Sequence, residues 1–277
     1  MKTRVPYIIV LTALLGSCSQ SPEVAKKSPK SAETKEALYR RGHQLFLEQQ
    51  FDSAAVLLER AVSIDGKYTP PLADLAEMHY LIGIRDGGDK HPKYVDGFIK
   101  ARECYARIEA LGVRESIVYE RLCELSDVMD DDSAFVFYAK KNAAVFPYDR
   151  QYFNLGFAYY KSGDYTNTIA SQKEAVEKFK DSPYIGSFYR QLGRAYLRVE
   201  RDQTAERTFA AGVQEVDNRL HEMRKAGSDY KSTDEYRRLL DDKIGMLTSL
   251  RSLHITYKAS DKLKQVEQEL KEANEHR

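Results

Sequence analysis

Between residues 151 and 213, apolar positions recur at the three- and four-residue spacing of helices that bury one face. Leu155-Gly156 and Leu192-Gly193 occupy the same place in two stretches that lie 37 positions apart. Each stretch predicts two helices, and the small residue after the leucine lets the second helix approach the first closely. Because neither helix can bury its apolar stripe alone, consecutive hairpins are expected to stack.

Both stretches follow one order of residue types. Tyr152 and Tyr189 open them, Leu-Gly-x2-Tyr follows, and an A-x3-F pattern begins at Ala205 in the second helix of the later stretch. This order resembles the tetratricopeptide repeat (TPR), whose signature is W-x2-L-G-x2-Y and then A-x3-F at a period of 34 residues. The resemblance implies an all-α fold, a TPR-type α-α superhelix whose concave groove holds extended or helical peptides. An ordinary helical bundle with chance Leu-Gly pairs is the alternative.

The same period extends toward the N-terminus. Leu72 and Ala76 lie 34 positions after Leu38 and Gly42. We therefore expect about five repeats over residues 35–213. Their approximate bounds are 35–68, 69–114, 115–148, 149–185 and 186–217. The third repeat is the most degenerate, since either Leu122 or Cys123 can take the Leu-Gly place.

The second repeat carries about 13 additional residues between its two helices, and they include the stretch from Gly83 to Lys93. Insertions in solenoids map to loops, so we expect a mobile loop here. Its glycines and aspartates do not form the D-x-D-x-D-G run of a calcium-binding loop.

Beyond Val213 the period ends, and residues 214–277 are expected to form a C-terminal helical extension that caps the array. The second helix of the fifth repeat is expected to continue from Glu215 to Lys225. The sequence from Ser232 to Glu235 resembles a capping box and opens a long amphipathic helix, and a charged helix follows from Asp261. A helix pair that binds a partner is the alternative interpretation of this segment.

The first residues have the pattern of a leader. Lys2 and Arg4 precede an apolar run about half as long as a membrane span, and Leu15-Gly16-Ser17-Cys18 follows. This run resembles the lipobox of bacterial lipoproteins. The resemblance implies a signal peptide at 1–17, acylation of Cys18, a flexible tether at 18–34, and a lipid-anchored protein of the cell envelope, on the outer membrane and facing the periplasm. A plain secretory signal that contains a cysteine is the alternative.

The charge balance and the cysteine and histidine spacing limit the classes of partner and ligand. The 43 basic and 42 acidic residues nearly balance, which argues against nucleic-acid binding. Cys104 and Cys123 fall in consecutive predicted helices, where they could form a disulfide or serve as small core residues. The chain has no CxxC or HExxH spacing, so we expect no metal and no cofactor.

Side chains one turn away from the Leu-Gly face of the first helices are expected to line the groove. Glu77, Glu120, Glu124 and Asp127 make its middle acidic, and the last repeats make the following part basic. Arg190, Arg194 and Arg198 form a ladder that could clamp carboxylates, or a solvated face paired with Glu200 and Glu206. The candidate groove residues are Tyr39, His43, Phe46, Glu77, Arg150, Phe153, Phe157, Tyr160, Arg190, Arg194 and Arg198.

No phosphate-binding loop, G-x-S-x-G turn or recognisable Cys/His pair is present, so we expect no enzyme. The sequence favours an adaptor that binds envelope proteins or peptides in its groove, in envelope biogenesis or assembly. Two other classes stay open. One is a peptidoglycan-acting hydrolase on a helical scaffold, and the other is a purely structural subunit of an outer-membrane complex.

Overall fold

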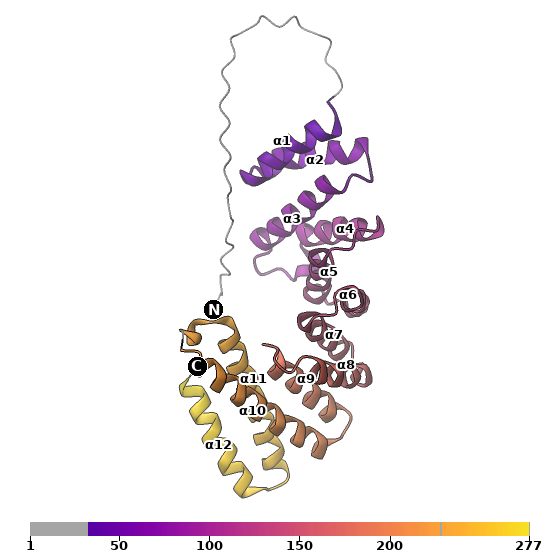
Figure 1. Cartoon of the computed structure of the whole chain (residues 1–277). Coiled ribbons are helices and arrows are strands. Elements are labelled where there is room, and N and C mark those ends of the chain that lie inside the picture. The colour runs from indigo at the N-terminus through magenta and orange to yellow at the C-terminus, as the bar shows by residue number, and fades with distance from the viewer. Residues whose placement is uncertain (1–32, 228, 277) are drawn as a thin grey trace, which may run out of the picture. The chain divides into compact units, whose positions relative to one another are not determined.

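The computed structural model describes residues 33–227 and 229–276, and this part of the chain contains helices and no strand, as Figure 1 shows. The expected all-α fold is confirmed. The leader, Cys18 and the tether up to residue 32 lie outside the described residues. The helices are α1 (Lys35–Leu47), α2 (Phe51–Ile64), α3 (Thr69–Asp86), α4 (Asp96–Ala110), α5 (Ser116–Val128), α6 (Asp132–Val145), α7 (Asp149–Lys161), α8 (Tyr165–Lys178), α9 (Ile185–Arg198), α10 (Asp202–Lys225), α11 (Asp234–Thr256) and α12 (Ser260–Glu275), with the 3-10 turns η1 (Pro92–Tyr94) and η2 (Tyr230–Ser232).

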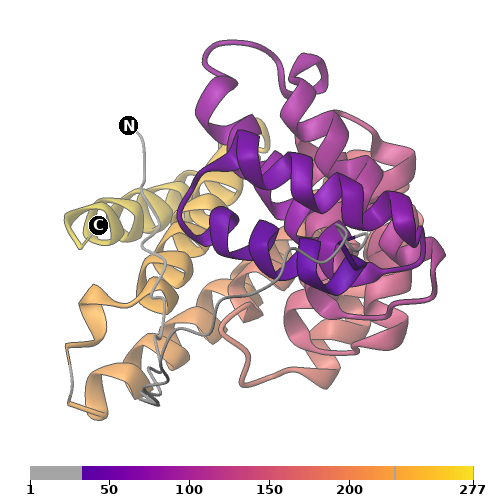
Figure 2. The ribbon, with the colours of Figure 1, turned by 90° about the horizontal axis from the view of Figure 1, so that it is seen from above.

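The helices pair into antiparallel hairpins that stack in chain order, as the two views in Figures 1 and 2 show. Within each hairpin the first helix packs on the second, and the second packs on the first helix of the next hairpin. First helices also contact one another, as α1 does α3, and as α9 does both α7 and α11. This two-layer order is that of a TPR-type superhelix, with the first helices closer together and therefore on the inner, concave side.

Small residues set the close approach inside the hairpins. Gly42, Ala76, Gly156 and Gly193 each lie midway along a first helix, and Cys123 takes this place in α5. Cys123 is buried against α6, which resolves the register of the third repeat. A Cβ atom on Gly193 would lie 2.4 Å from the ring of Phe209 on α10.

The structure corrects the predicted insertion. Gly83 belongs to α3, which continues to Asp86, and it is buried against α4. A Cβ atom on Gly97 would lie 2.5 Å from the backbone nitrogen of Gly83, so these two glycines let α3 and α4 cross closely. The connection itself is shorter than expected and contains η1. It is also held at one point, because His91 Nε2 lies 2.9 Å from Asp130 Oδ2 in the turn before α6.

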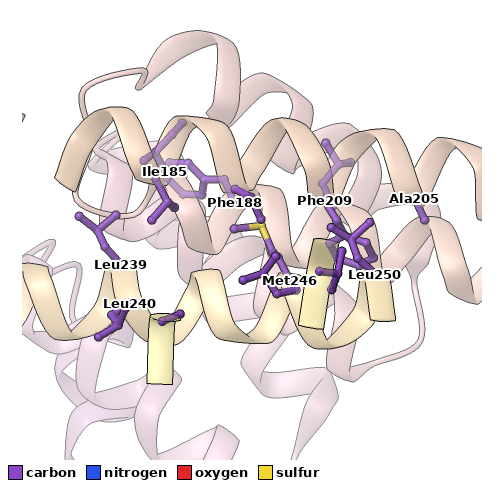
Figure 3. Packing of buried hydrophobic residues seen from close by; sticks show 14 of the residues in the cluster. Ile185, Phe188, Ala205, Phe209, Leu239, Leu240, Met246 and Leu250 are labelled. Carbon is purple, nitrogen blue, oxygen red and sulfur yellow. The ribbon is translucent and has the colours of Figure 1, made fainter. Parts of the chain in front are cut away.

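The C-terminal extension consists of the end of α10, the turn η2 and the helices α11 and α12, and α11 with α12 forms a sixth hairpin. Its cap differs from the expected one by a residue, since Thr233 Oγ1 accepts the amide hydrogen bond from Tyr236 at 3.1 Å. Figure 3 shows how Phe188, Phe209 and Met246 interlock where α9, α10 and α11 meet. No described helix has the length and apolar character needed to cross a bilayer.

The two cysteines of the helical region are free thiols. Burial raises the pKa of the Cys104 thiol to about 11 and that of the Cys123 thiol to about 12. Both are therefore protonated at neutral pH and pack as small core residues, one of the two roles expected for them.

Candidate functional site

The layer of first helices carries the predicted groove residues, and its N-terminal end is aromatic. Tyr39 and Phe46 lie on either side of His43, with ring centroids 5.5 and 6.4 Å from the imidazole. His43 Nδ1 lies 2.7 Å from Asp74 Oδ2 on α3. Burial raises the pKa of Asp74, and the contact with His43 opposes that shift. These three residues are brought together, but the histidine already has a partner.

The predicted acidic section is neutralised by the protein itself. Arg121 on α5 donates to Glu77 Oε1 at 2.9 Å and to Glu124 Oε2 at 3.0 Å, and its guanidinium lies 4.2 Å above the ring of Tyr80. The hydroxyl of Tyr105 donates a further hydrogen bond to Glu77 at 2.7 Å. The arginine side chain is only 11% exposed, so this network lies between the helices.

Two more cross-repeat ion pairs follow along the layer. Arg150 Nη1 on α7 lies 3.3 Å from Glu120 Oε2, and Lys161 Nζ lies 2.7 Å from Asp127 Oδ1. The sequence pattern predicted the carboxylates of this section but not Arg121 as their partner. The usable signal is that Arg121 stands on the first helix of the next repeat, opposite Glu77.

An aromatic cluster occupies the layer beside α9. The ring of Phe153 stacks on Phe157, with an interplanar angle of 4°, and on Tyr184, at 5.2 Å between centroids. Phe157 meets the ring of Phe135 edge-on at 5.9 Å. The guanidinium of Arg238 on α11 lies 4.2 Å above Tyr184. We call Phe153, Phe157 and Tyr184 the aromatic cluster; the structure brings two of the predicted groove residues together here.

The arginine ladder divides into two kinds of residue. Arg190 Nε lies 3.1 Å from Asp242 Oδ1 on α11, and the Asp242 side chain is 2% exposed. Burial raises the pKa of Asp242, and Arg190 and the hydroxyl of Ser187 oppose that shift. Arg190 therefore connects α9 to the C-terminal extension.

Arg194 and Arg198 are exposed and differently placed. Their guanidinium groups lie 4.6 Å above the ring of Tyr160 and 5.0 Å above that of Tyr165. Within residues 33–227 and 229–276, neither forms an ion pair with a carboxylate. Glu206, one acid proposed as a local partner, pairs instead with Lys262 at 2.6 Å and with His254 at 3.2 Å. The planar guanidinium edges of these two arginines remain accessible to a carboxylate ligand.

Other chemistry finds little support in the described residues. No group of three or more His, Cys, Asp or Glu side chains among them could hold a metal ion. Asp131, which precedes α6, caps that helix, since its Oδ1 accepts from the Ala134 amide at 3.1 Å.

Known structures share the fold. The crystal structure of MamA protein is 17% identical with a TM-score of 0.52, and the match covers 68% of this chain and 95% of that one. The crystal structure of YrrB, described as a TPR protein with an unusual peptide-binding site, is 10% identical with a TM-score of 0.52, covering 66% of this chain and 87% of that one. No protein-family model matches the chain. No curated protein matches it either.

Proposed function

We propose that this protein is a lipid-anchored adaptor on the periplasmic side of the outer membrane, which binds a segment of an envelope protein in its groove during envelope biogenesis or assembly. The TPR-type fold supports a role in protein interaction, and YrrB, of the same fold, is described as having a peptide-binding site. The lipobox resemblance at Leu15–Cys18 supports the anchor. The observation that carries the groove proposal is the exposed pair Arg194 and Arg198, which lack carboxylate partners within the described chain.

The chemistry of this section defines the ligand. A guanidinium that rests flat on a tyrosine ring keeps its edge N–H groups free to donate to a carboxylate in a bidentate manner. The aromatic cluster, with Phe153 and Phe157 on the neighbouring α7 and Tyr184 just before α9, offers ring surface for an apolar or aromatic side chain. We therefore expect a peptide segment with neighbouring carboxylates and one aromatic residue.

The groove can be tested with a fluorescent peptide that contains two adjacent glutamates and one phenylalanine, here called the acidic probe. Reversing two charges with Arg194→Glu and Arg198→Glu should weaken its binding to the chain from residue 19 onward at least tenfold. The matched control reverses Arg201 and Arg207, two exposed arginines outside the ladder. Equal affinity for both double variants would remove the arginines from the binding site.

The same variants address the natural partner. Crosslinking in cells should recover envelope proteins with the unmodified chain and with the Arg201/Arg207 control, but not with the Arg194/Arg198 double variant. The proposal assigns no catalytic role, so turnover of peptidoglycan by the purified chain would contradict it.

The anchor has its own test. Cys18→Ala should abolish incorporation of labelled fatty acid and move the protein from the membrane to the soluble fraction, because acyl chains rather than a basic surface would hold it there. A variant that stays in the outer-membrane fraction without acylation would overturn this part of the proposal.

A further inference from the structure

The C-terminal extension adds a further helix to the layer that carries the groove residues. α11 packs on α9 as α9 packs on α7, so the layer of first helices continues past the last repeat. The two helices approach closely at Gly186 of α9, where an added Cβ atom would lie 2.9 Å from the Cβ atom of Asp242 on α11. The extension therefore stands directly beside the helix that carries the arginine ladder.

Arg238 on α11 repeats an arrangement that occurs twice in the ladder. Its guanidinium lies 4.2 Å above the ring of Tyr184, which immediately precedes α9. Arg194 and Arg198 lie 4.6 and 5.0 Å above their own tyrosine rings. In each case the ring occupies one face of the guanidinium and leaves the N–H groups at its edge for an acceptor. The half-buried Arg238 is thus a third arginine supported by a tyrosine.

The carboxylates closest to Arg238 along α11 have other partners. Asp234, one turn before it, pairs with Arg237 at 2.5 Å, and Asp242, one turn after it, pairs with Arg190 at 3.1 Å. Burial raises the pKa of Asp242, and Arg190 opposes that shift more than Arg238 does. Over residues 33–227 and 229–276, no carboxylate forms an ion pair with Arg238. Its donors are therefore not used up by the protein's own acids.

A stretch of aromatic surface separates Arg238 from the other two arginines. Tyr184, which supports Arg238, lies ten positions before Arg194. At the rise of an α-helix this interval is roughly 15 Å, which about five residues of extended chain cover. The aromatic cluster lies along it, because Phe153 stacks on Tyr184 and Phe157 stacks on Phe153 one turn further along α7. Ring surface is thus flanked by basic groups at both ends.

We propose that Arg238 is a third ligand-binding arginine of the groove, and that the bound segment carries a third carboxylate about five residues from its acidic pair, with its aromatic residue between them. This inference rests on the proposed function of the groove and adds the order and spacing of the ligand. The acidic pair binds Arg194 and Arg198, the aromatic side chain rests on the aromatic cluster, and the third carboxylate binds Arg238. The extension then has a binding role besides covering the end of the repeats.

Three fluorescent peptides of equal length test the spacing by anisotropy. The spaced peptide has two adjacent glutamates, then a phenylalanine, then a third glutamate five positions beyond the pair. The second peptide has glutamine at that last position, and the close-spaced peptide has the third glutamate directly beside the pair. The chain from residue 19 onward, which retains the whole compact helical unit from Lys35, should bind the spaced peptide about five- to tenfold more tightly than either of the others. The close-spaced peptide has the same net charge, so it controls for general attraction.

Variants on neighbouring positions of α11 locate the third contact. Arg238→Gln should lower the affinity for the spaced peptide to that for the glutamine peptide, and it should leave the glutamine peptide unaffected. Arg237→Gln is the matched control, because Arg237 is 63% exposed and already pairs with Asp234. It should change the affinity for either peptide less than twofold. The peptide comparison on the unmodified chain does not depend on the folding of any variant, and circular dichroism checks that both variants are folded.

The outcomes separate this inference from the function on which it rests. If the glutamine peptide binds through Arg194 and Arg198 but the spaced peptide gains nothing, the role of Arg238 is overturned and the groove function stands. The same holds if the close-spaced peptide binds as tightly as the spaced one, or if the gain survives Arg238→Gln. If no peptide binds, or if binding is unchanged by Arg194→Glu with Arg198→Glu, the groove function and this inference both fail.

Discussion

The two halves of the first-helix layer, α1 to α5 and α7 to α9, use similar residues for different purposes. Between α3 and α5, Arg121 donates to two glutamates and stacks on a tyrosine, and its side chain is nearly buried. Beside α7, Arg194 also stacks on a tyrosine, but it is exposed and has no carboxylate partner in the described chain. In the first half the charges hold neighbouring repeats together. In the second half they remain available to a ligand.

The difference originates in the residue that faces each arginine from the preceding first helix. α3 presents Glu77 to Arg121, and α5, which carries Arg121 itself, adds Glu124. α7 presents Tyr160 to Arg194, and the same helix carries Phe153 and Phe157 of the aromatic cluster. A ring supports the guanidinium without using its N–H donors, whereas a carboxylate uses them.

The largest expected effect comes from removing the compensated arginine. Arg121→Ala should lower the free energy of unfolding by about 2–3 kcal/mol, since it leaves Glu77 and Glu124 without a counter-ion in a partly buried site. Arg194→Ala, the matched change in the other half, should cost less than about 0.5 kcal/mol because its charge is exposed. Urea unfolding followed by circular dichroism measures both.

If the two alanine variants lose equal stability, the distinction between a structural and an accessible half fails. Binding of the acidic probe should show the reverse order. Its affinity should fall with Arg194→Ala and stay unchanged with Arg121→Ala as long as the protein remains folded.

A smaller loss of stability is expected for Arg190, the one arginine of the ladder that pairs with a carboxylate of the protein itself. Arg190→Ala should cost about 1–2 kcal/mol, because Asp242 loses its counter-ion but has a raised pKa that lets it take up a proton, and it keeps the hydrogen bond from Ser187. Asp242→Asn in the same chain should restore part of that loss, since the amide can still hydrogen-bond to Ser187 without a buried charge. A double-mutant cycle on unfolding free energies measures the coupling. Additive losses would show that the 3.1 Å contact contributes nothing.

The fold was predictable from the sequence because its signals are local. Leu155-Gly156 and Leu192-Gly193 each combine an apolar and a small residue midway along a first helix. In the structure both glycines are buried against the second helix of their own hairpin, as expected. The limits of α3 were not predictable in the same way. Gly83 looks like the start of a loop, and only its contact with Gly97 on the facing helix explains why it is helical.

The pairing of charges on the first helices could not be predicted from sequence spacing. Glu77 and Arg121 lie 44 positions apart, which is longer than the repeat period because of the inserted residues between them. The spacing therefore does not show that the two side chains face each other from neighbouring first helices. The partner of Arg190 lies in the extension, where the repeat pattern that would align it has ended. Exposure, which separates Arg194 from Arg121, depends on those cross-repeat contacts and not on the residue itself.

The pH dependence of stability tests the burial of Asp242 without removing Arg190, and its expected effect is smaller. The folded-state pKa of Asp242 is raised by burial, so the folded protein binds this proton more tightly than the unfolded chain does. The stability that this group contributes is fully present below the pKa of an unfolded aspartate, near 3.9, and is lost as the pH rises through the raised folded value. The stability of the unmodified chain relative to Asp242→Asn should therefore fall with rising pH and then level off. A difference that grows with pH would contradict the direction of the shift.

The smallest expected effect concerns the rings that support the accessible arginines. Tyr160→Leu keeps an apolar side chain of similar reach but removes the ring face beneath Arg194, and an exposed cation–π contact is worth about 0.5–1 kcal/mol. The acidic probe should bind two- to fivefold more weakly, because the guanidinium loses its preferred position, while the unfolding free energy changes little. Tyr148→Leu is the control, since that tyrosine is 64% exposed and makes no contact with the ladder arginines in the described chain. If the two leucine variants bind the probe equally well, the rings of α7 do not orient the arginines, and the contrast between the halves depends on the missing carboxylates alone.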